Sequence, residues 1–215
     1  MLHIQFFHSV LCGHCYIMSD RLRILSDKYK NLKITHHSHP LRWNEENTEI
    51  KFDTKEEAKN NVIHKWEVAN KIDGKNRFNV EGLEHMNYEE PYARRAMLAI
   101  RAGVRAGGNS WDLFDLFQTA LYKHNKDISD EEVIARIIEN TDINFRKWLV
   151  FYEDPETENM EFEDFRKIDK YNLNLVPAMV IEGKHVIEGT KRLDLAENLI
   201  LEIADTEEIN LILNK

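Results

Sequence analysis

The two cysteines of the chain, Cys12 and Cys15, are separated by Gly13 and His14 in the sequence Cys-Gly-His-Cys. They fall where an apolar strand pattern gives way to a helical one, so we expect Cys12 at the N-terminus of a helix. Free backbone N–H groups and the positive end of the helix dipole stabilise a thiolate at such a position. A C-x-x-C pair beside a βαβ pattern is typical of a redox motif. These residues are therefore expected to form a redox-active site.

The two thiols are expected to have different roles. Cys12 would be the exposed nucleophile at the helix tip, and Cys15, one turn further on, the partly buried resolving thiol. Exchange proceeds by attack of a thiolate on a disulfide, through a mixed disulfide that the second cysteine resolves. The alternative is a stabilising disulfide or an incidental pair. The three-residue spacing disfavours it, because so short a loop restrains little chain.

His14 lies between the thiols, where a positively charged imidazole would favour the Cys12 thiolate and make it a better leaving group. The alternative is a solvent-facing residue on the first helical turn without a redox role. We place His14 with Cys12 and Cys15 among the catalytic residues.

A second candidate segment is Val176-Pro177, at the start of a strand that we expect beside the dithiol. Proline is tolerated at the first residue of a strand, and a cis X-Pro bond costs about 0.5–1 kcal/mol. A cis bond here would turn the backbone of Val176 toward the sulfurs and offer an edge to an extended substrate. The sequence thus predicts a cis bond and two substrate-binding residues.

Three histidines, His36, His37 and His39, follow a second predicted strand that is expected to end at Thr35. Parallel strands end on the same edge of a sheet, so this cluster should lie on the same rim as Cys12. We expect a polar, solvated loop. The alternatives are substrate contact and a transition-metal site shared with the two thiolates. We assign no metal to the protein.

The elements that position these residues follow from hydrophobic periodicity. Residues 2–8 predict a buried strand, and apolar residues at helical spacing continue from Cys15 to about Tyr29. With the second strand at 32–35, they form a right-handed βαβ unit.

The middle of the chain is predicted to be entirely helical. Thr54 and Ser129 each begin a capping box, and Ala93, Met97, Ile100 and Val104 form an apolar stripe. Strand character returns at residues 176–181. A turn at 182–184, a strand at 185–187 and a helix from Leu193 follow.

This order predicts an α/β, thioredoxin-like fold interrupted by an all-helical insertion. Residues 1–45 and 172–215 would form the thioredoxin-like domain, and residues 46–171 the insertion domain. A chain of 215 residues is long enough to bury such a core.

The net charge and the N-terminal segment indicate which partners and which compartment to expect. The formal net charge of −9 argues against a nucleic-acid backbone or an anionic membrane as the main partner. No apolar run is long enough to span a membrane. Residues 1–11 are apolar but too short for a signal peptide, and they lack a basic n-region. We expect a cytoplasmic protein, where a lone cysteine pair is more often catalytic or metal-binding than structural. The helical patterns are compatible with a homodimer without demonstrating one.

Several segments together resemble the DsbA family of thiol–disulfide oxidoreductases, specifically its cytoplasmic FrnE-like branch. They are Cys12–Tyr16, Tyr92–Gly108, Trp111–Phe114 onward through Asp127–Asp130, and Val176–Ala178. That branch also includes the 2-hydroxychromene-2-carboxylate isomerases and the kappa-class glutathione transferases.

The resemblance implies that Cys12 is the nucleophile, Cys15 the resolving thiol and Pro177 the cis-proline. Family members often carry Pro-Trp or Pro-His between the cysteines, whereas Gly13-His14 resembles protein disulfide isomerase. Ser9 stands where an acidic residue is often found.

The expected activity is dithiol–disulfide exchange, of the oxidase, isomerase or reductase type, on thiol- or disulfide-containing proteins or small thiols. We expect no cofactor beyond the Cys12–Cys15 disulfide, with glutathione as a candidate electron donor. The Gly-His dipeptide suggests a potential of roughly −200 to −150 mV.

Two alternatives stay open. One is a glutathione-dependent transferase or isomerase, against which Cys12 argues, because those relatives carry serine at that position. The other is a metal-binding protein that uses the Cys/His cluster.

Overall fold

The computed structural model describes residues 1–44, 54–86 and 91–214. The helices and strands follow one another in this order: β1 (Leu2–His8), α1 (Gly13–Lys28), β2 (Leu32–Ser38), α2 (Lys55–Asp73), α3 (Val80–His85), α4 (Arg94–Arg105), α5 (Ser110–Tyr122), α6 (Glu131–Glu139), α7 (Phe145–Tyr152), α8 (Pro155–Tyr171), β3 (Ala178–Ile181), β4 (His185–Glu188) and α9 (Leu193–Thr206).

The chain divides into two compact units. Residues 1–39 and 163–215 form one unit, and residues 40–162 form the other. The expected first boundary, at 45/46, lies outside the described residues. The expected second boundary, at 171/172, is the end of α8, whereas the units divide within that helix. Of the residues that the structure describes, all those in strands belong to the first unit.

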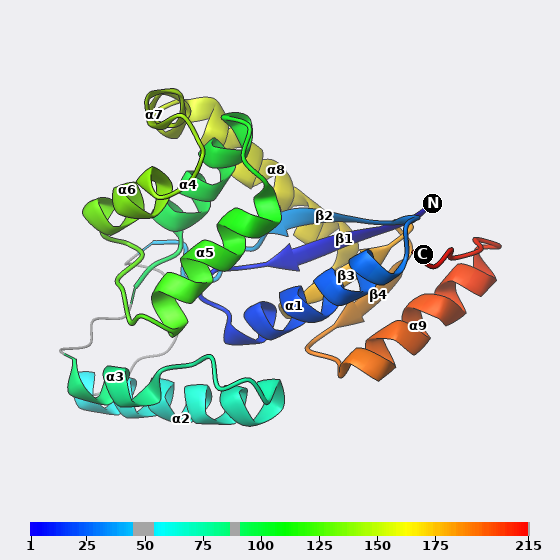
Figure 1. Ribbon diagram of the computed structural model, residues 1–215, viewed down its shortest axis with the longest axis horizontal. Coiled ribbons are helices and arrows are strands. Elements are labelled where there is room, and N and C mark those ends of the chain that lie inside the picture. The colour runs from blue at the N-terminus through cyan, green and yellow to red at the C-terminus, as the bar shows by residue number, and fades with distance from the viewer. Residues whose placement is uncertain (45–53, 87–90, 215) are drawn as a thin grey trace. The chain divides into compact units, whose positions relative to one another are not determined.

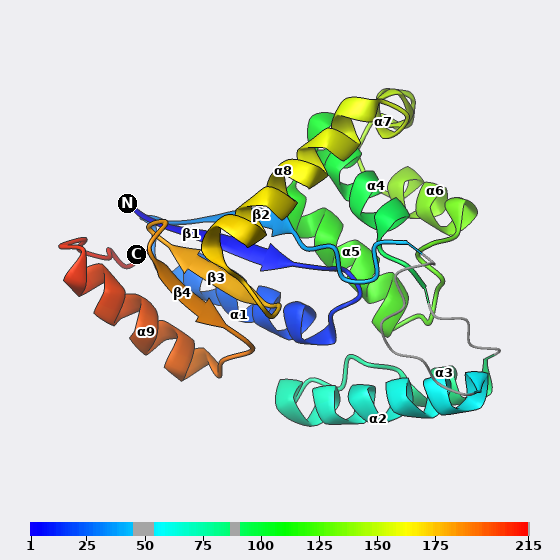
Figure 2. The same cartoon turned by 180° about the vertical axis from the view of Figure 1, so that it is seen from behind.

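The first unit is built around a four-stranded sheet with the order β2-β1-β3-β4. β1 and β2 are parallel, and the β1–β3 and β3–β4 pairs are antiparallel. α1 lies on one face of the sheet and the C-terminal part of α8 on the other (Figures 1 and 2). This arrangement confirms the predicted α/β, thioredoxin-like fold and its βαβ and ββα halves.

The β1–β2 register decides which side chains share a face of the sheet. Gln5 pairs with Thr35 and Phe7 with His37, so all four lie on the face that the end of α8 covers. The ring of Tyr171, the last residue of α8, contacts that of Phe7 edge-on at a centroid distance of 6.2 Å. The buried cluster beneath this helix contains Phe7, Leu173, Ala178 and Val180.

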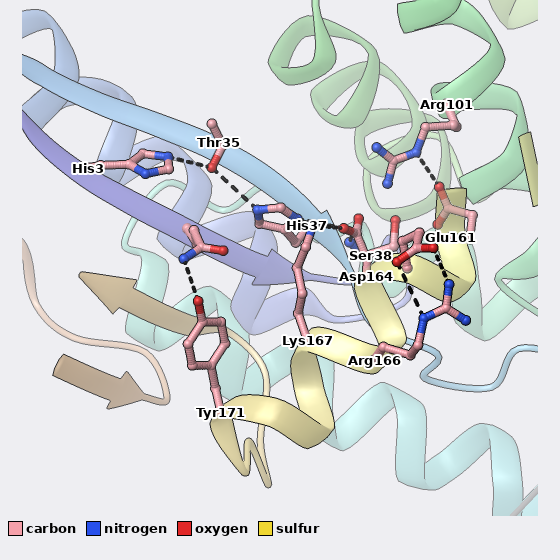
Figure 3. Close-up of polar contacts among 12 residues, drawn as sticks. His3, Thr35, His37, Ser38, Arg101, Glu161, Asp164, Arg166, Lys167 and Tyr171 are labelled. Carbon is pink, nitrogen blue, oxygen red and sulfur yellow. Dashed lines mark hydrogen bonds and ion pairs between the residues drawn. The ribbon is translucent and has the colours of Figure 1, made fainter. Parts of the chain in front are cut away.

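In the described residues of the second unit, the regular elements are all helices. The indole nitrogen of Trp148 in α7 donates to the carbonyl oxygen of Ala99 in α4 across 3.0 Å. Arg101 of α4 forms an ion pair of 2.6 Å with Glu161, which is fully buried in α8 (Figure 3). Val104, predicted in the apolar stripe, is 37% exposed instead, because the stripe turns outward at the end of α4.

Of the two predicted capping boxes, one is correct and one is wrong in detail. The Thr54 side chain caps α2 by accepting from the amide of Glu57. In α6 the cap is Asp130, which accepts from the amide of Glu132. The amide of Ser129 instead donates to the carboxylate of Asp127 at 2.8 Å. Ser129 therefore lies one residue before the N-cap position of α6. No helix of the described residues is both long and apolar enough to cross a bilayer.

Candidate active site

Cys12 caps the N-terminus of α1. Its backbone is extended, with φ −100° and ψ 104°, and its Sγ accepts a hydrogen bond of 3.2 Å from the amide of Cys15. The preceding loop closes through a 3.1 Å bond from the amide of Cys12 to the carbonyl oxygen of Ser9. Cys12 is only 8% exposed, so the expectation of an exposed nucleophile is wrong: the residue is buried at the helix tip in this structure. The amide of Cys15 therefore offers a donor to negative charge on this sulfur.

Cys15 lies one turn further along α1 and is completely buried. Both residues carry thiols, and no disulfide joins them. Burial raises the pKa of the Cys15 thiol well above its usual value, and the hydrogen bond and charge of Cys12 raise it further. A backbone hydrogen bond from Ser9 acts in the opposite direction. The pKa of Cys15 is therefore raised most when Cys12 is a thiolate.

The carbonyl oxygen of Val176 lies 3.6 Å from Sγ of Cys12, which donates to it. The Val176–Pro177 peptide bond is cis, as the sequence predicted. This contact brings the two predicted segments together, although they are separated by 164 positions in the chain. That they bind substrate stays a prediction.

The chain before Val176 is held by a residue that the sequence did not single out. One carboxylate oxygen of Glu188, at the end of β4, accepts from the amides of Asn174 and Leu175 at 2.5 and 3.0 Å. The amide of Gly189 donates to the carbonyl oxygen of Pro177 at 2.8 Å. The end of β4 therefore fixes the segment that presents Val176 to Cys12. A glutamate at the end of a hairpin strand carries no local signal of such a role.

His14 is exposed on the first turn of α1, and its Nδ1 lies 3.0 Å from Oγ1 of Thr190. Neighbouring chain still desolvates the ring enough to lower the pKa of His14 below its usual value. The charged imidazole that the sequence argument used is therefore less populated at neutral pH than in an isolated histidine. The assignment of His14 to redox tuning stays a prediction.

The expectation of a solvated loop at His36 and His37 is wrong, because β2 continues to Ser38 and includes both. His36 points to the face opposite His37. Its Nδ1 lies 3.0 Å from Nε2 of His8, which is buried at the end of β1. His39 follows the strand and donates its amide to the carbonyl oxygen of His8 at 2.8 Å. These histidines are part of the sheet and its edge.

His37 belongs to a polar cluster that joins β2 to α8 (Figure 3). Its Nδ1 lies 2.6 Å from Oδ1 of Asp164, and the amide of Ser38 donates to Oδ2 of Asp164 at 3.0 Å. Lys167 donates to the same carboxylate at 2.9 Å. Asp164 is 3% exposed, and these donors compensate its burial. The cluster explains why His37 is half-buried instead of solvated.

The histidine cluster and the thiols do not form a metal centre within the described part of the chain. Nowhere in residues 1–44, 54–86 and 91–214 do three His, Cys, Asp or Glu side chains lie in positions that could hold one ion. The metal-binding alternative thus gains no support from the structure.

The sequence matches the family of DSBA-like thioredoxin domains over residues 3–201. The chain therefore belongs to this family, whose members are thiol–disulfide oxidoreductases. No protein with a curated description matches the sequence.

Solved structures share the fold along almost the whole chain. A candidate protein disulfide isomerase from Nitrosomonas europaea superposes with a TM-score of 0.78 at 13% identity, covering 96% of this chain and 98% of its own. The cytosolic disulfide reductase DsbM from Pseudomonas aeruginosa gives 0.72 at 13% identity, with the same two coverages. A 2-hydroxychromene-2-carboxylate isomerase gives 0.67 at 13% identity, again covering 96% and 98%. At these identities the similarity establishes the fold.

Proposed function

We propose that this protein is a dithiol–disulfide oxidoreductase that works through Cys12 and Cys15. The observation that supports this most directly is the position of Cys12 Sγ, which accepts from the amide of Cys15 and lies 3.6 Å from the carbonyl oxygen of Val176. One thiol thus retains 8% exposure and has a donor for its charge, and a second thiol is completely buried one turn behind it.

In the reducing direction, the Cys12 thiolate attacks one sulfur of a substrate disulfide. A bond forms between Cys12 and that sulfur, and the other substrate sulfur leaves as a thiolate. Cys15 then loses its proton and attacks Sγ of Cys12, which releases the second substrate thiolate and leaves a Cys12–Cys15 disulfide. Two electrons have passed to the substrate, and two equivalents of an external thiol such as glutathione return them. The reverse sequence oxidises a dithiol.

The charge and the hydrogen bond of Cys12 both act on Cys15, and they determine the order of the two exchange steps. While Cys12 is a thiolate, its charge and its hydrogen bond help to keep Cys15 protonated. A mixed disulfide at Cys12 removes that charge, so deprotonation of Cys15 becomes easier at the step that requires it. The resolving thiol is therefore activated by capture of the substrate.

The proposed substrates are thiol- or disulfide-containing proteins or small thiols in the cytoplasm. The net charge of −9 makes nucleic acid or an anionic membrane an unfavourable partner. DsbM, which shares the fold, is described as a cytosolic disulfide reductase. A couple at roughly −200 to −150 mV would be mostly reduced in a cytosol at about −250 mV, and so available to reduce or reshuffle disulfides.

The deciding experiment is a titration of the purified protein in glutathione buffers, after treatment with a chelator. A reversible two-electron transition at about −200 to −150 mV is expected, and a value near −270 mV would make the protein a thioredoxin-like reductase. Cys12→Ser should abolish reduction of a disulfide substrate. If no Cys12–Cys15 disulfide forms at any potential, or if Cys12→Ser keeps full activity, the proposal is wrong.

A further inference from the structure

Thr190 contacts His14 at two points. Its Oγ1 lies 3.0 Å from Nδ1 of the His14 ring and 3.5 Å from the His14 carbonyl oxygen. The two residues are 176 positions apart, and Thr190 lies in the loop between β4 and α9. No pattern in the sequence links them.

The loop that carries Thr190 is anchored on both sides. The preceding residue, Gly189, has a positive φ of 77° and donates its amide to the carbonyl oxygen of Pro177. The following residue, Lys191, accepts at its carbonyl oxygen from Nη1 of Arg21 at 2.6 Å. The Nζ of Lys191 also donates to the carbonyl oxygen of Glu188. The backbone on either side of Thr190 is therefore held in place by contacts independent of His14.

A hydroxyl suits this position because it can donate and accept. When Nδ1 lacks a proton, Oγ1 can donate to it. When the ring is an imidazolium, Nδ1 donates to Oγ1, and the hydroxyl proton can turn to the His14 carbonyl oxygen. In this second arrangement the Nδ1–H group, the hydroxyl and the His14 carbonyl oxygen all have hydrogen-bond partners. One of the two bonds is charge-assisted, so the second arrangement is the stronger of the two.

We propose that Thr190 is a positioning residue that holds the His14 imidazole and supports its protonated form, and thereby shifts the Cys12–Cys15 couple toward oxidation of substrates. This inference rests on the proposed function and on the proposed role of His14. An imidazolium stabilises the Cys12 thiolate, which is present only in the reduced state. Removing the acceptor for the imidazolium should therefore favour the disulfide.

The test compares Thr190→Val with Thr190→Ser in glutathione buffers. Valine has the shape of threonine without the hydroxyl, and serine restores the hydroxyl. We expect Thr190→Val to lower the equilibrium constant for reduction of the disulfide by about three- to tenfold. Because a tenfold change is 29.6 mV, the potential would fall by about 15–30 mV. Thr190→Ser should stay close to the original value.

The His14→Ala background tests whether Thr190 acts through the imidazole. There, adding Thr190→Val should leave the potential unchanged, since the ring that the hydroxyl holds is absent. Thr206→Val is the matched control, because its hydroxyl donates to the Glu202 carbonyl oxygen within α9, and it should not move the potential. An equal shift from Thr190→Val with and without His14 would overturn the proposal.

An NMR titration of the His14 ring in the reduced protein gives a readout that does not require a working couple. Thr190→Val should lower the pKa of His14 relative to Thr190→Ser and the unaltered protein. If His14 titrates identically in all three, Thr190 does not position it and the inference fails, even where the glutathione titration supports the oxidoreductase. If no disulfide forms but the pKa moves, the contact is real and the proposed function is what has failed.

Discussion

The amide of Cys15 donates a hydrogen bond to Sγ of Cys12 across 3.2 Å, so the backbone of the second cysteine supports the sulfur of the first. The two cysteines therefore have different environments although they are only one helical turn apart. Cys12 is 8% exposed and Cys15 is not exposed at all.

The first prediction is that iodoacetamide modifies Cys12 much faster than Cys15 in the reduced protein at pH 7. Burial and the contact with Cys12 raise the pKa of Cys15, and its thiolate fraction falls about tenfold for every unit by which the pKa exceeds the pH. Peptide mass spectrometry over a time course measures both rates. In urea the two rates should converge, and equal rates in the folded protein would contradict the assignment of roles.

The second prediction concerns Cys15→Ser. Cys12 can still attack a disulfide in this variant, but no thiol remains to resolve the mixed disulfide. Incubation with oxidised glutathione should therefore give a stable adduct of one glutathione per chain, visible by intact-protein mass spectrometry and removed by dithiothreitol. Cys12→Ser, treated in parallel, should give little adduct. Multiple turnover by Cys15→Ser would instead favour transferase or isomerase chemistry.

The third prediction is a loss of stability at mildly acidic pH that depends on His39. Burial lowers the pKa of His39, and its buried Nδ1 has no hydrogen-bond partner among the described residues. Since the folded state binds this proton less readily than the unfolded state, the free energy of unfolding is highest above about pH 6.5 and falls as the pH is lowered through the folded pKa.

The measurement is urea unfolding at a series of pH values from about 7.5 down to about 5. His39→Asn should flatten the decline by about 1.4 kcal/mol for each unit by which the pKa of His39 is lowered. His64→Gln, which removes an exposed imidazole from α2, is the control and should retain the original slope. An unchanged slope in His39→Asn would show that other groups cause the decline.

The fourth prediction compares two neighbouring carboxylates of α8. Asp164 is buried and accepts from Ser38, His37 and Lys167, whereas Glu163 forms an exposed ion pair with Arg166. Asp164→Asn should cost about 3 kcal/mol of unfolding free energy, because it leaves charged or buried partners without a carboxylate.

Glu163→Gln is the matched control, and it should change the unfolding free energy by about 0.5 kcal/mol or less, since exposed ion pairs contribute little. Chemical denaturation at pH 7 measures both variants. Equal effects of the two substitutions would show that the polar cluster contributes nothing beyond a surface pair.

The parts of the site that the sequence predicted are those with a local signature. The spacing of Cys12 and Cys15 at a strand-to-helix change, and a proline at the start of a returning strand, each indicate chemistry from a few residues. The structure adds the 3.6 Å contact that joins the two segments.

The parts that were missed depend on distant partners. The sequence predicts that β2 ends at Thr35, whereas the strand runs to Ser38, and the burial of His37 depends on Asp164, 127 positions later. Likewise, Thr190 and Glu188 act through contacts that only the folded chain creates. At the start of α6, Ser129 and Asp130 are adjacent residues that can each act as an N-cap. The sequence pattern alone does not decide which of the two side chains accepts the hydrogen bond.

The distance along the chain between Cys12 and Val176 has a consequence for biosynthesis. A ribosome adds 164 residues between the first reactive thiol and the carbonyl group that faces it. At about 5–20 residues per second, that interval is roughly 8–33 s. During this time both cysteines of the nascent chain lack the last two strands of their sheet, so cellular oxidants and thiols can react with them before the complete site has formed. The oxidation state of the two cysteines in a nascent chain should therefore follow the redox potential of the surroundings. Only in the completed fold do the contacts of the site determine the potential of the Cys12–Cys15 couple.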